Sequence, residues 1–275
     1  MDDSILRPVR AVSPVAAYVG GKRLLAKRLV PLIQSIPHVT YAEGFVGMGG
    51  VFLKRERVPK AEVINDASRD VATLFRILQR HYAAFLDFIR YQITVRAEFE
   101  RLTTVDPDTL TDLERAARFL YLQRLSYGGK VSGRSFGVDP TSAGSFNVTR
   151  LGPILEALHE RLAGVVIECL SFDAFIPRYD RPGTLFYFDP PYFGTEGYYG
   201  KDLFSREDFG LLAALLGGIQ GRFILSLNDH PDVRAIFRDF AISEVTTTYT
   251  TSGRGHAVKA PELIITNAPD CLALL

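Results

Sequence analysis

The stretch that decides the fold reads TLFYFDPPY over residues 184–192. Its first five residues are typical of a buried strand, which then ends at Asp189, Pro190, Pro191 and Tyr192. Because proline has no N–H and a fixed backbone angle, the carbonyl groups of this segment are held rigidly. A carboxylate and a carbonyl, both acceptors, beside a flat tyrosine ring suit the amino group of a planar base. The same residues are equally consistent with a strand that simply ends at two prolines.

A second informative stretch, YAEGFVGMGGVFL, occupies residues 41–53. We expect a strand end at residues 39–42 and a helix from Val51 onward, with a glycine-rich turn between them. Such a turn lets a ligand approach the backbone near a helix N-terminus. The dinucleotide fingerprint G-x-G-x-x-G fails, because Phe52 stands at its last glycine position. The turn is therefore a candidate nucleoside site of another kind.

The next predicted strand, residues 61–66, ends in an acid, Asp66. It lies roughly 20 residues past the turn, where an acid at the second strand of a parallel sheet can bind ribose hydroxyls. The alternative is that the glycines serve packing and that Asp66 caps a helix.

Near the N-terminus, AYVGGK at residues 17–22 is not a P-loop, because Ala16 and Arg23 stand at two of its required positions. We interpret it as a Gly-Gly turn before a helix.

Taken in order, these motifs resemble the Dam-like N6-adenine DNA methyltransferases. The order is Gly20-Gly21-Lys22, then Phe45-Val46-Gly47-Met48-Gly49, an insert, and Asp189-Pro190-Pro191-Tyr192, so the resemblance runs from about Ala17 to Asn267. It implies an α/β fold: a Rossmann-like methyltransferase sheet with helices on both faces and a mainly helical target-recognition insert. It also implies S-adenosylmethionine as methyl donor and adenine in double-stranded DNA as acceptor, with the base flipped out of the duplex.

The resemblance assigns roles to individual residues. Asp189, Pro190, Pro191 and Tyr192 are the expected catalytic residues, with direct in-line transfer to the adenine amino group. The expected cofactor-binding residues are Tyr18, Gly20, Gly21, Lys22, Glu43, Phe45, Gly47, Gly49, Asp66, Phe172 and Asp173. Asp173 is also a plausible helix N-cap, since an apolar stretch follows it.

The insert is expected at residues 75–163, between catalytic-domain segments 1–74 and 164–275. Residues 116–155 hold five basic residues against Asp139 alone, which suits either a phosphate footprint or a solvated surface. The expected DNA-binding residues are Arg124, Tyr127, Lys130 and Arg134. The insert starts like the family pattern and then departs from it, so no target sequence is carried over.

The overall composition of the chain agrees with the resemblance to this family. The chain has 275 residues, a net charge of +1, 47% hydrophobic residues and no long apolar run, so we expect no membrane span. Two cysteines and no signal peptide indicate the cytoplasm. The five histidines form no metal-binding pair, so no metal is expected. A G-x-S-x-G match at residues 133–137 lacks the strand and helix that a nucleophile elbow needs.

Periodicity gives the remaining elements. Helices are expected at residues 22–36, 67–93, 112–127, 154–162 and 206–216 and after Pro231, and strands at 165–170 (buried), 223–227, 241–250 and 262–266.

Two rival functions remain. One is methylation of another planar group, such as adenine in RNA, cytosine N4 in DNA or a protein glutamine. The other is an inactive DNA-binding module. A separately acting restriction endonuclease is a further expected partner.

Overall fold

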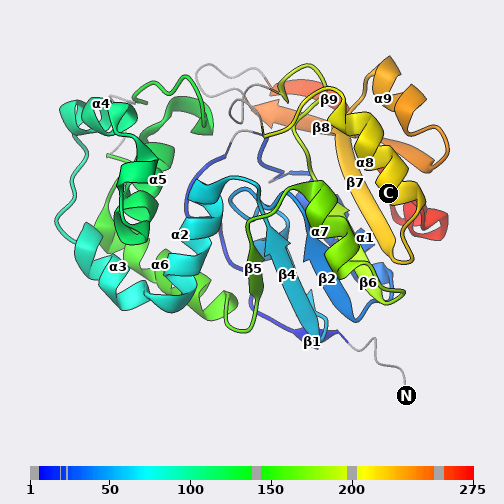
Figure 1. Ribbon diagram of the computed structural model, residues 1–275, viewed down its shortest axis with the longest axis horizontal. Coiled ribbons are helices and arrows are strands. Elements are labelled where there is room, and N and C mark those ends of the chain that lie inside the picture. Colours follow the sequence, from blue (N-terminus) through cyan, green and yellow to red (C-terminus); the bar gives the residue numbers. More distant parts are fainter. Residues whose placement is uncertain (1–5, 19, 23, 138–143, 197–202, 251–256) are drawn as a thin grey trace.

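The chain folds around a seven-stranded sheet, shown for this computed structural model in Figure 1. The structure describes residues 6–18, 20–22, 24–137, 144–196, 203–250 and 257–275, with the backbone alone at 247–250 and 257–260. The strand order is β5-β4-β2-β6-β7-β9-β8. The strands are β2 (Thr40–Glu43), β4 (Ala61–Asn65), β5 (Val166–Glu168), β6 (Thr184–Phe188), β7 (Arg222–Asn228), β8 (Ala241–Thr250) and β9 (Ala257–Thr266). A separate antiparallel ladder pairs β1 (Arg7–Pro8) with β3 (Arg57–Val58).

Strand direction places the site. Strands β5, β4, β2, β6 and β7 run parallel, whereas β9 is antiparallel to both of its neighbours. The chain builds outward from β2 to β4 and β5, and then returns to add β6 and β7 on the other side of β2. Ligands of open α/β sheets bind at the carboxyl ends of the strands where the order reverses in this way. The mostly parallel sheet confirms the predicted Rossmann-like α/β fold.

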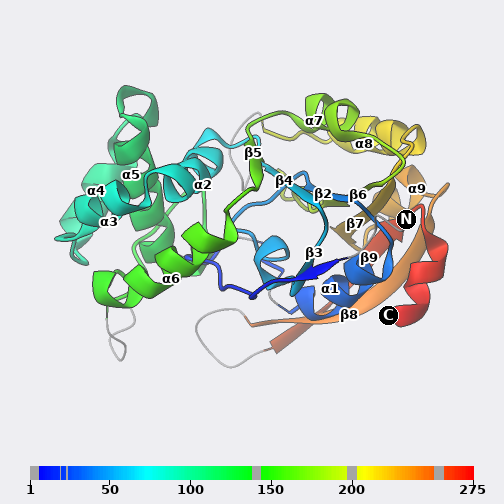
Figure 2. The same ribbon diagram turned by 90° about the horizontal axis from the view of Figure 1, so that it is seen from below.

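Helices cover both faces of the sheet, as predicted (Figure 2). Helix α1 (Ala26–Ser35) lies on one face, and α7 (Phe172–Tyr179) and α8 (Asp208–Gly217) lie on the other. Successive strand residues point to opposite faces. Tyr41 and Tyr187 therefore join the hydrophobic cluster of α1, while their neighbours Ala42 and Phe188 join that of α7 and α8. The short helix α9 (Pro231–Ile236) belongs to the second cluster through Val233.

Five helices form a second part of the molecule beside the sheet, on the left of Figure 1. They are α2 (Arg69–Arg80), α3 (Tyr82–Ile89), α4 (Arg96–Thr104), α5 (Asp112–Leu125) and α6 (Val148–Arg161). Helix α5 begins with a capping box, in which Thr111 and Glu114 satisfy each other's backbone N–H groups. The insert boundary expected at residue 74 falls inside α2, and Phe75 and Phe119 share one cluster with Tyr41 of the sheet. The helical part and the sheet therefore share a core.

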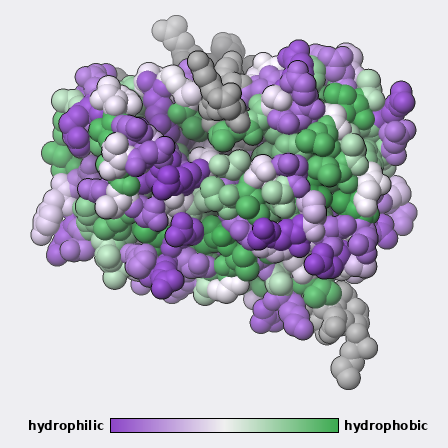
Figure 3. Space-filling view, in the orientation of Figure 1, coloured by the Kyte–Doolittle hydropathy of each residue, from purple (hydrophilic) through white to green (hydrophobic). Residues whose placement is uncertain are grey.

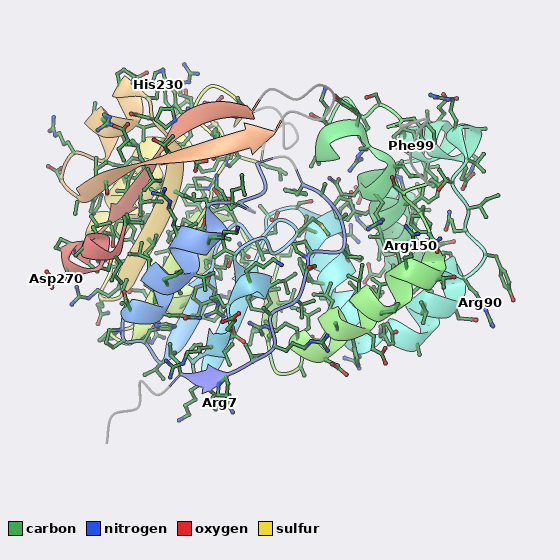
Figure 4. All side chains as sticks on the ribbon, turned by 180° about the vertical axis from the view of Figure 1, so that it is seen from behind. Arg7, Arg90, Phe99, Arg150, His230 and Asp270 are labelled. Atoms are coloured by element: carbon green, nitrogen blue, oxygen red, sulfur yellow. The ribbon has the colours of Figure 1, made fainter. Side chains whose placement is uncertain are left out.

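Short 3₁₀ segments complete the described chain. They are η1 (Phe52–Lys54), η2 (Pro107–Thr109), η3 (Tyr127–Gly129) and η5 (Pro269–Leu274). Seen from behind, Phe99 and Arg150 lie on the helical part and Asp270 on the sheet part (Figure 4). Arg7 and His230 mark opposite ends of the strands in the same view, His230 on the carboxyl side after β7.

The helix predicted from Val51 is wrong. In its place there is the single 3₁₀ turn η1, after which Arg55 is extended and the chain enters β3. Two long-range contacts compete with a helix here: β3 pairs with β1, and the fully buried Arg55 reaches Glu62 of β4. A local glycine-then-apolar pattern does not reveal either contact, which is why the sequence favoured a helix.

Other element predictions also need correction. The helix expected from residue 22 begins only at Ala26, because Gly20 adopts φ 71° and Gly21 closes a turn onto the Tyr18 carbonyl. The strand expected to be buried at 165–170 is the three-residue edge strand β5, and Val166 is 46% exposed because no strand covers its outer side. Helix α4 was not predicted. The single helix expected at residues 67–93 is two helices, α2 and α3, separated at His81. The remaining predicted helices and strands are present with shifted ends.

The surface shows no segregation by polarity on the face drawn in Figure 3, where hydrophilic residues cover the helical and sheet parts alike. Among the residues that the structure describes, the helices are all too short or too polar to cross a membrane. Exposed large apolar side chains include Tyr91 and Ile93 in the turn before α4. Isolated apolar side chains of this kind are ordinary on protein surfaces.

Candidate active site

A cavity of about 540 Å³ opens where the strand order reverses, at the carboxyl ends of β2 and β6. Small-molecule sites usually measure roughly 300–1,000 Å³, so it has the size of one ligand site. The predicted catalytic and cofactor-binding residues that line it are Tyr18, Gly20, Gly21, Lys22, Glu43, Phe45, Gly47, Asp66, Asp189 and Pro191. The structure thus brings the three sequence motifs to one cavity.

The glycine turn after β2 lines part of the cavity. Gly47 and Gly49 have φ values of 50° and 76°, which side chains other than glycine rarely adopt. A Cβ atom at Gly47 would also lie 3.0 Å from the ring of Tyr18, so glycine keeps backbone and ring in close approach. Gly49 itself faces Leu53 and Phe75 and is not among the residues that line the cavity. Its role is to shape the turn.

Asp66 supports the turn as well as lining the cavity. Its Oδ2 accepts the N–H of Gly47 at 2.9 Å, and its Oδ1 accepts the N–H of Ser68 at 2.9 Å. Ser68 is the N-cap residue of α2, so the carboxylate braces the start of that helix. Burial raises the pKa of Asp66 to about 6, although both N–H donors act to lower it. Asp66 thus supports the helix start from two positions before the N-cap residue, and its expected binding of ribose hydroxyls stays a prediction.

Glu43 ends β2 and is 1% exposed. The Tyr41 hydroxyl donates to its Oε2 at 2.5 Å, and the Arg55 guanidinium lies 3.5 Å from the centroid of the Tyr41 ring. Burial raises the pKa of Glu43 to about 8, even though Tyr41 and Arg55 favour its ionised form. The Glu43 carboxyl group therefore holds its proton more tightly than an exposed glutamate does.

Lys22 joins the two predicted sites. It was predicted to bind the cofactor, but its buried ammonium lies 2.9 Å from Oδ1 of Asp189, in the predicted acceptor site. It also donates to the hydroxyl of Tyr192 and lies 3.6 Å from the Glu262 carboxylate. Lys22 still lines the cavity, so it belongs to both sites.

The Asp-Pro-Pro-Tyr motif follows β6 directly. Within the described residues, both hydrogen-bonding contacts of Asp189 go to Oδ1, one from Lys22 and one from Ser226 Oγ at 3.1 Å. Burial raises the pKa of Asp189 to about 6, and Lys22 opposes that rise. Pro191 lines the cavity, whereas Pro190 is buried and is not among the lining residues. Tyr192 is partly buried, and its hydroxyl hydrogen-bonds the Glu262 carboxylate.

Sequence reasoning missed Ser226 and Glu262 as site residues. Both were inside correctly predicted strands, Ser226 in β7 and Glu262 in β9. Both are buried, at 0% and 1% exposure. A polar residue inside an apolar strand run is the signal that would have drawn attention to them, because buried polar groups need partners.

Phe172 and Asp173 lie away from the cavity lining. The Phe172 ring stacks behind Phe45 at 6.2 Å between centroids, so it supports a ring that does line the cavity. Asp173 is exposed in the first turn of α7, where Ser171 is the N-cap residue. The alternative reading of Asp173 as the N-cap is therefore off by two positions. Phe204 closes the cavity over Phe45, with ring centroids 5.6 Å apart.

The four predicted DNA-binding residues differ in accessibility. Tyr127 is 48% exposed and Lys130 is exposed. Arg124 lines the cavity and holds two carbonyl groups, that of Val15 at 2.6 Å and that of Ser145 at 2.7 Å. Arg134 is folded inward, with its guanidinium 5.9 Å from the Phe119 ring centroid and two of its nitrogens buried. It would have to leave this position to reach DNA.

A family model for "D12 class N6 adenine-specific DNA methyltransferase" matches residues 18–251, which include most of the residues that line the cavity and the whole helical part. The chain belongs to this family. It is a DNA adenine methyltransferase, which methylates adenine at N6 in DNA. The resemblance drawn from the three motifs is thereby confirmed, and so is the predicted activity.

Two relatives match this chain over nearly the whole length of both proteins. "Type II methyltransferase M1.LlaDCHI" from Lactococcus lactis subsp. cremoris is 26% identical over 92% of this chain and 95% of its own. "Retron Ec67 DNA adenine methylase" from Escherichia coli is 24% identical over 94% of this chain and 93% of its own. A solved precorrin 8w decarboxylase from Methanobacterium thermoautotrophicum covers 88% of both chains at 12% identity, but its TM-score of 0.37 is too low to support an argument.

Family membership implies S-adenosylmethionine as the methyl donor of this adenine methyltransferase. The residues present fit such a group. The acceptor oxygens of Glu43 and Asp66, the Phe45 ring and a glycine turn that would not admit a Cβ at Gly47 together suit a nucleoside with hydroxyl groups. Within the described ranges, His, Cys, Asp and Glu side chains form no group of three that could hold a metal ion.

Proposed function

We propose that this adenine methyltransferase binds the donor in the 540 Å³ cavity and the target adenine at its Asp189 side. The observation that carries the proposal is that Asp189 lines the same cavity as Gly47 and Asp66. A donor held by the turn and an amino group held by Asp189 then meet without any rearrangement of the sheet. Proximity and orientation of this kind can supply up to about 7–11 kcal/mol of a barrier.

On the donor side, we assign the sugar hydroxyls to Asp66 and the backbone approach to Gly20, Gly21 and Gly47. Phe45 and Tyr18 supply ring faces, and Glu43 offers a carboxyl group whose pKa of about 8 lets it donate or accept. Phe172 supports Phe45 from behind. Asp173, exposed on α7, would contact the donor only at the rim of the cavity.

On the acceptor side, Asp189 and the Pro190 carbonyl accept the two amino hydrogens of adenine. S-adenosylmethionine supplies an electrophilic methyl group on a positively charged sulfur. When the adenine nitrogen took this methyl group, the electron pair of the S–C bond would leave with the sulfur. The nitrogen then carries one surplus proton, which Asp189, with its pKa of about 6, accepts and passes to water.

The target base must leave the duplex to reach Asp189, at a cost of a few kcal/mol. Lys22 covers one face of the Tyr192 ring, at 3.9 Å from the centroid. We assign the other face to stacking on the flipped base, which contributes about 1–3 kcal/mol per base. Pro191, which lines the cavity, completes the wall beside it.

We assign target recognition to the helical part, residues 75–163, with residues 1–74 and 164–275 as the catalytic part. Tyr127 and Lys130 are exposed on the segment after α5, and Arg124 lies where this segment meets the cavity. Arg134 contributes only if DNA binding draws it away from Phe119. A cytoplasmic location and a separately acting restriction endonuclease complete the proposal; the Lactococcus relative is named a type II methyltransferase.

Two variants test the assignment against each other. Asp189→Ala is expected to keep donor affinity and lose methyl transfer, because its carboxylate faces the acceptor. Asp66→Ala is expected to weaken donor binding by about 1.5–3 kcal/mol, the range for hydrogen bonds to a charged group. Calorimetry with S-adenosylmethionine and transfer of a tritiated methyl group to DNA measure the two quantities. Near-normal transfer by Asp189→Ala, or an unchanged dissociation constant for Asp66→Ala, contradicts the corresponding assignment.

A further inference from the structure

Strands β7 and β9 together tie the Asp-Pro-Pro-Tyr loop to the sheet at two consecutive residues, Phe193 through β7 and Tyr192 through β9. Glu262 of β9 lies opposite Asn228 of β7 in the strand register. Asn228 holds the Phe193 backbone from both sides, accepting its N–H at 2.9 Å and donating to its carbonyl at 3.1 Å. Glu262 holds the preceding residue through the hydroxyl of Tyr192. One pair of opposed residues therefore fixes two neighbouring positions of the loop.

Glu262 also acts on Lys22. The Lys22 ammonium lies 2.9 Å from Asp189 and 3.6 Å from Glu262, so one cation sits between two carboxylates. The hydrogen bonds run in one direction: Lys22 donates to the Tyr192 oxygen, and the Tyr192 O–H donates to Glu262. Lys22 and Glu262 are 3% and 1% exposed, so bulk water screens these contacts little.

The arrangement selects one oxygen of Asp189. Oδ1 receives Lys22 and the Ser226 hydroxyl, and Ser226 is in turn 2.9 Å from the Tyr187 hydroxyl. Oδ2 has no such contact with the part of the chain that the structure describes. The carboxylate is thus anchored on one side, and its second oxygen is left for a ligand in the cavity that Asp189 lines.

We propose that Glu262 is a positioning residue for methyl transfer, which anchors Tyr192 and holds Lys22 so that Asp189 presents Oδ2 to the acceptor amino group. The inference rests on the proposed function of Asp189 and adds a residue that none of the three motifs contains. Glu262 does not touch the substrate. Its effect reaches the reaction through Lys22, Tyr192 and Asp189.

This role predicts a specific change in how the methyl-transfer rate depends on pH. The charged and titratable groups that face Asp189 are Lys22, Glu262, Glu43, Tyr187 and Tyr192. Of these, Lys22 lowers the pKa of Asp189, whereas the negative charge of Glu262 raises it. Removing that charge lowers the pKa of Asp189. The acid limb of the pH profile, where the transfer rate falls as the pH is lowered, is therefore expected to move to lower pH. A residue that served only to stabilise the fold would not move this limb.

The test compares three variants at saturating donor and DNA, with single-turnover methyl transfer measured from pH 5 to 9. Glu262→Gln keeps an acceptor for Tyr192 and removes the charge; Lys22 remains paired with Asp189, so no buried charge is left alone. Tyr192→Phe removes the hydroxyl link and keeps the ring. Glu244→Gln on the neighbouring strand β8 is the control, because its side chain is 55% exposed and pairs with Arg234.

Glu262→Gln is expected to lower the transfer rate by roughly tenfold to a hundredfold, the scale of a displacement of about 1 Å at the reacting centre. Its acid limb moves to lower pH, and its affinity for S-adenosylmethionine stays within about twofold of the unaltered protein. Tyr192→Phe also slows transfer but leaves the limb in place. If Glu262→Gln matches Glu244→Gln in rate and pH limb, the inference is overturned. If the unaltered protein methylates no DNA, the proposed function fails instead.

Should Glu262→Gln not fold, which thermal unfolding would show, Tyr192→Phe carries the test. A rate equal to that of the unaltered protein would then remove the link between Glu262 and transfer. A variant that conserves the negative charge provides one more measurement. Glu262→Asp, which keeps the charge with a shorter side chain, is expected to keep the acid limb near its original position while its rate falls.

Discussion

At the scale of single residues, three carboxyl groups at the cavity share one property: burial raises the pKa of each. It reaches about 8 at Glu43 and about 6 at both Asp66 and Asp189. A carboxyl group with a raised pKa binds its proton more tightly in the folded state than in the unfolded chain. Stability therefore falls as pH rises through the interval between the two values, from 4.5 to about 8 for Glu43. Above the pKa values of the unfolded chain, these three groups therefore cost the folded protein stability.

Glu43→Gln removes the titration with little change in shape, because the amide oxygen can still accept from Tyr41. We expect the variant to be more stable than the unaltered protein near pH 8 and the difference to shrink toward pH 5. Each kcal/mol gained would raise Tm by about 2–4 °C in a protein of this size range. Calorimetric unfolding without donor over that pH interval measures it.

Glu56→Gln provides the control, because Glu56 is exposed and the same substitution there is expected to change Tm only slightly. A Glu43→Gln difference that stays constant with pH would mean that Glu43 is already ionised in the folded protein. The donor affinity of Glu43→Gln is a separate reading, because Glu43 lines the cavity.

At the scale of elements, a buried ion cluster joins three segments below the cavity. Glu62 of β4 accepts both terminal nitrogens of Arg161, at 2.7 and 2.8 Å, and also pairs with Arg55. Arg161 ends α6, and Arg55 follows the 3₁₀ turn η1, so one carboxylate connects the sheet, the helical part and the glycine turn. The two guanidinium groups pack on Phe52, at 5.7 and 4.0 Å from its ring centroid.

Removing Glu62 leaves two buried guanidinium groups without their shared counter-ion. Glu62→Ala is therefore expected to lower the free energy of unfolding by about 3–5 kcal/mol, the usual cost of breaking a buried pair from one side. Urea unfolding followed by circular dichroism measures the change in midpoint. Glu160→Ala, an exposed neighbour on α6, should change stability by less than about 0.5 kcal/mol. Equal effects from the two substitutions would show that the cluster adds nothing to stability.

At the scale of the whole molecule, the sheet and the helical part meet along the N-terminal segment. The Gln123 amide donates to the Ala17 carbonyl at 2.8 Å, and Arg124 donates to the Val15 carbonyl at 2.6 Å. A Cβ at Gly129, whose φ is 67°, would lie 2.9 Å from the Ala17 backbone, so glycine permits this close approach. The exposed Tyr127 and Lys130 are thereby held near the cavity that Arg124 lines.

DNA that enters the cavity from this side should meet Lys130 first. Lys130→Ala is expected to weaken DNA binding evenly across sequences and to reduce the slope of log affinity against log salt by about one, as for a lost phosphate contact. A fluorescence-anisotropy titration at several salt concentrations measures both. Lys60→Ala, exposed before β4 near the opposite ends of the strands, is the control. An unchanged slope in Lys130→Ala would exclude the phosphate contact.

The sequence by itself determined the fold class and most of its elements. Strands such as residues 184–188 and 223–227 were predictable because an apolar run bounded by turn residues depends on neighbours in the chain. The order of the three motifs identified the family for the same reason: each motif is a local stretch. Local signals failed at η1, where β3 and the Arg55–Glu62 pair replace the predicted helix.

Only the tertiary structure decided how the site is assembled. Lys22 and Tyr192 are 170 positions apart, and nothing in the residues around either one indicates their contact. The register of β9 against β7 brings Glu262 to the same point, while Arg134 of the basic segment turns inward onto Phe119. Such pairings depend on how the strands and helices pack, and burial then sets the pKa values of Glu43, Asp66 and Asp189. Sequence patterns specify which elements form, whereas packing specifies which distant side chains meet and how they are charged.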